Sequence, residues 1–182
     1  MTYLRPIVQV LLLLLVIPAA LYDSRQRRVP NWLALAGLLL GIGLNSFLYE
    51  STGLLTSLKG LGVAFLIYFP LYLLRAMGAG DVKLMAAIGA IAGPANWLGI
   101  LVLTALFGGV AALVLVTVKG RVRATLQNIW VILLSARAGR APYVDHPQLD
   151  VRGGQGLRLP HAVSIAFGSF GFLLAAAFWA PR

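Results

Sequence analysis

Cysteine is absent from this chain of 182 residues, and acidic residues are scarce, with five Asp and Glu against fifteen Lys and Arg. A chain without cysteine forms no disulfide and no thiolate metal site, and it has no thiol nucleophile. Histidine is nearly as rare: His146 and His161 lie in different segments, and two imidazoles are too few to indicate a metal site. We therefore expect a protein that uses neither a metal ion nor another cofactor.

Charge of either sign is also scarce. Charged residues make up 11% of the chain, whereas 60% of its residues are hydrophobic, which is typical of a membrane protein. The formal net charge of +10 does not indicate a nucleic-acid partner, because the basic residues cluster beside apolar runs, where they face anionic membrane lipids. The length suits one domain, so we expect residues 1–182 to form a single polytopic membrane domain.

Apolar stretches recur along the chain, and a transmembrane helix needs about 20 such residues. The sequence predicts six helices, at residues 4–22, 31–48, 54–74, 82–92, 96–118 and 159–180. The fourth is about half a bilayer long, so it should be a partial helix or continue past Gly93-Pro94. Asn31 is expected to cap the second helix. The predicted fold is an all-α integral membrane protein, a bundle of about six transmembrane helices with a cytoplasmic amphipathic segment. Tryptophans near the span ends are expected to be interface anchors: Trp32, Trp97, Trp130 and Trp179.

The basic residues predict the orientation, because lysine and arginine accumulate in cytoplasmic loops. If the three arginines of residues 25–28 lie inside, the alternation of six helices puts twelve of the fifteen basic residues inside and both termini outside. Asp23 and Asp81 then emerge at the same, cytoplasmic face. A cleaved signal peptide is the competing interpretation of the first apolar stretch, but its basic region would hold Arg5 alone.

Residues 119–158 form the only substantial polar segment, and the alternation makes them a cytoplasmic loop. Residues 138–157 are rich in Gly and Pro, so they should be a loop within it. That loop is either a lid or substrate-docking strip, or a connector that returns the chain to the membrane. Before it, apolar residues at steps of three and four beside arginines predict an interfacial amphipathic helix: Val122, Leu126, Ile129, Trp130, Leu133 and Leu134.

Asp23 and Asp81 each adjoin an apolar run long enough to enter a bilayer. An ionisable group near hydrocarbon is costly, so it needs a partner, water or a function. Two such carboxylates brought together form an acid and base pair that can activate water. Structural roles stay open for both: Asp81 suits the N-cap of the following helix, and Asp23 suits an ion pair with a neighbouring arginine in a solvated loop.

Two motifs and their spacing resemble a known family. The string D-x-R-x-x-x-x-P-N runs from Asp23 to Asn31, and G-x-G-D-V-K-L runs from Gly78 to Leu84. Both closely resemble the type IV prepilin peptidases, membrane aspartic proteases of the GxGD kind, and the likeness extends through most of the chain. Residues 159–168 look like the last helix of the short members that serve tight-adherence (Flp) pilus systems. Longer members carry a four-cysteine zinc region with methyltransferase activity, and without cysteines no such activity is expected here.

The resemblance implies an aspartic endopeptidase of the bacterial inner membrane. Its substrates would be prepilins or pseudopilins, which lose a short basic leader at the cytoplasmic face, next to their hydrophobic N-terminal helix. Asp23 and Asp81 would be the catalytic pair, and the active-site loop would hold Gly78, Gly80 and Lys83.

The loop glycines are expected to admit positive φ or close approach of substrate, so that Gly80→Ala would push the loop away from Asp23 or block the substrate strand, and would slow cleavage. Lys83 would either extend to the lipid headgroups or bias the charge of the pair. Two other functions stay open. Paired membrane acids also relay ions, as in a small proton-coupled transporter, and in a pilus-assembly scaffold the acids would be structural.

Overall fold

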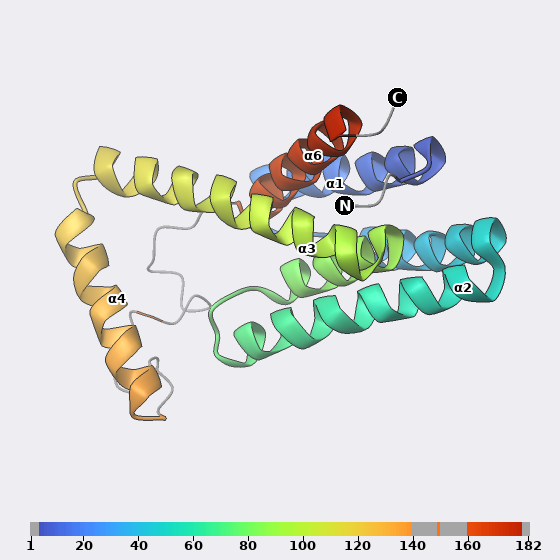
Figure 1. Cartoon of the computed structure of the whole chain (residues 1–182). Coiled ribbons are helices and arrows are strands. Elements are labelled where there is room, and N and C mark those ends of the chain that lie inside the picture. The colour runs from blue at the N-terminus through green and yellow to red at the C-terminus, as the bar shows by residue number, and fades with distance from the viewer. Residues whose placement is uncertain (1–3, 140–148, 150–159, 180–182) are drawn as a thin grey trace.

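The computed structural model describes residues 4–139, Leu149 and 160–179. In these residues the chain forms five α-helices, which Figure 1 shows as a bundle with one helix set apart. Four of the five are long and apolar enough to cross a membrane. The expected all-helical membrane protein is therefore confirmed at this level. The helices are α1 (Pro6–Gln26), α2 (Asn31–Leu73), α3 (Ala79–Val118), α4 (Val122–Arg137) and α6 (His161–Trp179).

The helices α2 and α3 each fold back on themselves, so four long helices replace the six separate ones that the sequence predicts (Figure 1). In α2 the polar run 49–53 predicts a loop, but Glu50 is the residue that leaves helical geometry, with φ 54° and ψ −135°. In α3 the reversal lies at Gly93, with φ 75° and ψ 168°. The short stretch 82–92 is accordingly the first arm of a longer helix, and it begins earlier, at Ala79.

The two arms of α2 pack against the first arm of α3 through glycines. A β-carbon on Gly60 would overlap the carbonyl oxygen of Gly89, and one on Gly89 would overlap the carbonyl oxygen of Gly60. Small residues at such a crossing let two helix backbones approach closely, as is usual in membrane bundles.

A buried polar cluster closes the fold-back end of this unit. The Asn45 Nδ2 amide donates to Ser57 Oγ at 2.9 Å and to the carbonyls of Ala90 and Ile91 at 3.0 Å each. These two carbonyls precede the reversal at Gly93, where the helical hydrogen-bond ladder is interrupted. Asn45 therefore donates the hydrogen bonds that these buried carbonyl groups need in a membrane.

Trp97 lies in the core and is not an interface anchor, so that prediction is wrong. Its side chain is fully buried, and its Nε1 donates to the Met85 carbonyl across the two arms of α3 at 3.0 Å. Because the chain reverses at Gly93, Trp97 at the start of the predicted helix 96–118 faces the first arm of α3. Trp32 and Trp130 are 61% and 64% exposed, and their anchoring role stays a prediction. The side chain of Trp179 lies outside the described residues.

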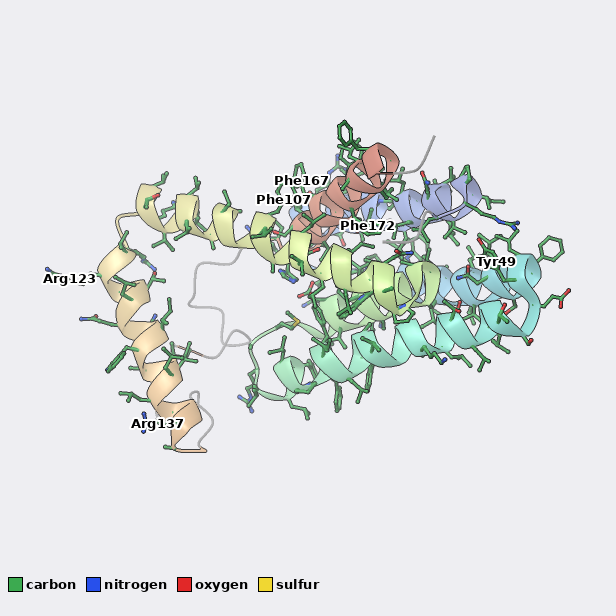
Figure 2. The ribbon with its side chains drawn as sticks, in the orientation of Figure 1. Tyr49, Phe107, Arg123, Arg137, Phe167 and Phe172 are labelled. Atoms are coloured by element: carbon green, nitrogen blue, oxygen red, sulfur yellow. The ribbon has the colours of Figure 1, made fainter. Side chains whose placement is uncertain are left out.

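The helices α1 and α6 lie side by side and cover the other face of α3 (Figure 1). Phe172 is fully buried in this layer, and Gly168 packs against Thr104 of α3. Figure 2 shows Phe107 and Phe167 extending from α3 and α6 on the same side, with ring centroids 5.9 Å apart. The bundle thus has two layers, α1 with α6 and α2 with α3, and they meet mainly where α6 packs against α3.

The helix α4 lies apart from the bundle and joins it through the end of α3 (Figure 1). Its apolar side chains are exposed, and Arg123 and Arg137 point away from the bundle (Figure 2). The predicted helix in this segment is confirmed, whereas its place at the membrane interface stays a prediction. The predicted loop at residues 138–157 falls, apart from residues 138, 139 and 149, outside the described residues.

Candidate active site

Asp23 lies inside α1, whose helical geometry continues past residue 22 to Gln26 and ends at Arg27 in the left-handed conformation, with φ 55°. The predicted helix ended at residue 22 and left Asp23 in a loop. In the structure the added turn carries Asp23 into the bundle, where its side chain is only 7% exposed. The alternative of an ion pair in a solvated loop is therefore wrong for this residue.

The partner of Asp23 comes from the far end of the chain. Its Oδ2 accepts a hydrogen bond from the backbone N–H of Ala162 at 3.0 Å, and the contact is buried. Ala162 is the second residue of α6, so this N–H is one of the first-turn donors that have no partner within their own helix. A carboxylate at a helix N-terminus satisfies such a donor, and here it fixes the Asp23 side chain in place.

Asp81 is the third residue of α3, and the N-cap of that helix is Gly78. The prediction of Asp81 as the N-cap residue is therefore wrong by position. The Asp81 carboxylate instead accepts a hydrogen bond from the Gly78 N–H, as the side chain of the third helical residue does in a capping box. The carboxylate is thereby held at the start of α3.

Both aspartates line one cavity of about 500 Å³ at the same end of the bundle. Asp81 also interacts electrostatically with Asp23 and with His161, and Tyr68 interacts with Asp81. Two carboxylates that interact in this way titrate as a pair, so one of them can act as base while the other acts as acid. We call this cavity the dyad pocket. Its lining residues are Asp23, Gln26, Arg27, Arg28, Val29, Pro30, Asn31, Gly78, Ala79, Gly80 and Asp81.

Gly78 and Gly80 line the dyad pocket, but neither needs a glycine backbone. Gly78 is extended, with φ −80°, and Gly80 lies within the first turn of α3. A β-carbon on Gly80 would lie 3.4 Å from Val29 Cβ, and one on Gly78 would lie 3.5 Å from Asp81 Oδ2, both ordinary contacts. The expectation of positive φ is therefore wrong. What the two glycines provide is open space in the pocket.

We expect Gly80→Ala to leave the melting temperature of the purified protein unchanged or slightly raised. Alanine fits the space, and it favours a helix over glycine by about 1 kcal/mol. Gly93→Ala is the contrasting variant, because φ there is +75° and the new atom would meet Thr56 Cγ2 at 2.7 Å. A melting temperature that falls equally in both variants would contradict this. Slower cleavage by a stable Gly80→Ala protein would then report crowding of substrate and not displacement of the aspartates.

Lys83 lies on the exposed side of α3, one turn from the dyad pocket. Its Nζ donates to Asn31 Oδ1 at 2.9 Å, so it links the start of α3 to the start of α2. Asn31 is the first helical residue of α2, and the N-cap position before it is held by Pro30. The predicted capping role of Asn31 is therefore wrong, and its side chain serves this contact.

His161 is a polar residue of this region for which the sequence predicts no role. It begins α6, directly before the amide that binds Asp23, and its Nε2 is buried without a hydrogen-bond partner among the described residues. The one signal in the sequence is a histidine after Pro160 at the start of an apolar span. The Ala162 amide carries no side-chain signal at all, because it is a backbone group.

Comparison with known families gives one match. The model of the type IV leader peptidase family matches residues 10–113, more than half of the chain. The matched range contains Asp23, Gly78, Gly80 and Asp81, and it ends before α4. Comparisons with curated proteins and with solved structures gave no match.

Proposed function

Because the chain belongs to the type IV leader peptidase family, we propose that it is a membrane aspartic endopeptidase that removes the leader of type IV prepilins or pseudopilins. The observation that carries this proposal is the placement of Asp23 and Asp81 in one pocket at one end of a bundle of apolar helices. The family supplies the peptidase activity. The two carboxylates can activate water, so the proposed reaction needs no nucleophilic side chain.

The proposed reaction is the attack of water on the peptide carbonyl at the leader junction. One ionised carboxylate takes a proton from the water as the new carbon–oxygen bond forms, and the other, protonated, donates to the carbonyl oxygen. The first carboxyl group, now protonated, then gives its proton to the leaving amine as the carbon–nitrogen bond breaks, and the second takes back a proton from a hydroxyl group of the tetrahedral intermediate. The hydrogen bonds from Ala162 to Asp23 and from Gly78 to Asp81 would hold both carboxylates in position during these steps.

The leader itself would lie over the open part of the dyad pocket. Arg27 and Arg28 line this pocket together with the two aspartates. A charge match with the pocket lining therefore does not account for the basic character of the leader.

We also propose that the two arms of α2 and of α3 each cross the membrane, which with α1 and α6 makes six crossings. Each arm of α2 would then span separately, since a helix of 43 residues is about 65 Å long, twice the hydrocarbon thickness. The dyad end carries the arginines of residues 25–28, and Arg5 lies at the other end, over the ring of Tyr49 beside the α2 reversal. The positive-inside rule then makes the dyad end cytoplasmic.

This topology predicts that cysteines introduced at Ser24 and at Ser51 are labelled from opposite sides of the membrane. Both positions are exposed and the chain has no other cysteine, so each reports one end of the bundle. In intact cells a membrane-impermeant maleimide should label Ser51→Cys, and Ser24→Cys only after the membrane is opened. Equal labelling of both variants in intact cells would contradict the fold-back of α2 across the membrane.

The function is tested by coexpression with candidate prepilins and by detection of leader loss as a gel shift, with the new N-terminus read by mass spectrometry. Conversion of a prepilin to its mature form supports the peptidase. A protein that processes no prepilin but moves protons across vesicle membranes would instead be the transporter that paired acids also permit. Processing that persists without either carboxylate would point to a scaffold.

A further inference from the structure

A second cavity, of about 420 Å³, adjoins the dyad pocket on the side of α2 and α3. Both arms of α2 and the first arm of α3 form its walls, and Leu35 and Phe65, 57% and 45% exposed, leave it open to the bundle surface. Apart from Asn31 and Lys83 the lining is apolar. We call it the apolar groove, and its lining residues are Asn31, Ala34, Leu35, Leu38, Leu61, Phe65, Val82, Lys83 and Ala86.

The apolar groove borders the dyad pocket. Asn31 lines both cavities, and its hydrogen bond with Lys83 stands where they meet. Lys83 follows Asp81 by two residues along α3. By contrast, the apolar cavity between α1 and α6 shares no lining residue with the dyad pocket.

We propose that the apolar groove binds the apolar helix that follows the leader in the substrate, so that this helix enters from the lipid and presents the leader junction to the aspartates. The proposal rests on the proposed function, and it names the surface that the substrate occupies. A polypeptide segment within hydrocarbon keeps its backbone hydrogen bonds internal, so the substrate reaches the groove as a helix.

The side chains of Asn31 and Lys83, at the border of the two cavities, can bind a substrate backbone that leaves the helical conformation. The scissile peptide must leave the helix to be attacked, and the backbone groups freed at that point need partners in a membrane. Lys83 has further N–H donors, and Asn31 has both a donor amide and an oxygen with a second lone pair.

The first test fills the groove. Leu35→Trp should raise KM for a full-length prepilin on the order of tenfold with kcat little changed, because it removes binding that is uniform through the reaction. Leu40→Trp is the matched control: it lies on the same helix, is 57% exposed like Leu35 and lines no described cavity. An unchanged KM in Leu35→Trp, or an equal rise in both variants, would overturn the proposal.

The second test does not depend on turnover. A photoreactive phenylalanine derivative at position 35 should capture the apolar segment of a prepilin in membranes, and the same probe at position 40 should not. Capture of lipid alone at position 35 would overturn the proposal, because the groove would then be a lipid site. If the unmodified protein removes no leader while position 35 still captures the prepilin, the proposed function fails and the binding surface stands.

Discussion

Asp23→Asn and Asp81→Asn should each lower the rate of leader cleavage by at least about a hundredfold, and by up to about ten-thousandfold, which is the range that acid and base groups contribute. Each change keeps nearly the volume of the side chain and removes its ability to exchange a proton. The two variants should also be about as inactive as the double variant, because the pair acts as a unit. The measurement is a time course of prepilin processing in membranes with matched amounts of protein.

Glu50→Gln is the matched control for this experiment. It makes the same kind of acid-to-amide change at an exposed residue at the α2 reversal, away from the dyad pocket. It should process prepilin at the unmodified rate. A normal rate in either aspartate variant would remove that residue from the catalytic pair, and a large loss in Glu50→Gln would show that the assay responds to charge in general.

Gly60→Ala should destabilise the bundle strongly, although it adds a single methyl group. The added carbon would overlap the carbonyl oxygen of Gly89, a backbone atom that cannot rotate away, so α2 and α3 must separate. We expect a loss of about 3 kcal/mol in the free energy of unfolding, at the upper end of what overpacking usually costs. Thermal unfolding of the purified protein in detergent measures it.

Gly62→Ala is the control for Gly60→Ala, because a β-carbon there meets no atom within 4 Å. Both glycines lie in the second arm of α2, so the two variants make the same change in helix propensity. Gly62→Ala should therefore unfold at or slightly above the temperature of the unmodified protein. Equal melting temperatures for the two variants would show that α2 and α3 do not cross as closely as the structure has them.

The sequence predicts the apolar elements well, because length and hydropathy decide them locally. The stretches 31–48, 54–74, 82–92 and 96–118 all recur as helical arms, and the predicted amphipathic helix is α4. What it misses is how the arms are joined. A polar run such as 49–53 reads as a loop, whereas a single residue with positive φ suffices to reverse the chain.

The environment of Asp23 could not be predicted for a different reason. The residues after Tyr22 are polar and basic, which predicts a solvated loop. The group that binds the Asp23 carboxylate inside the bundle is the backbone N–H of Ala162, 139 residues away. Trp97 shows the same limit, since its partner is the carbonyl of Met85 across a reversal that the pattern does not reveal. Contacts made by backbone atoms leave no side-chain signature in the sequence.

The origin of that amide also sets an order in the synthesis of the protein. A nascent chain that has emerged as far as α4 already contains Asp23 and Asp81, but not the start of α6 that binds the first of them. This hydrogen bond to Asp23 forms only after α6 has been translated and inserted beside α1. The proposed peptidase activity, where it needs Asp23 held in this way, would thus arise as a late event of membrane insertion.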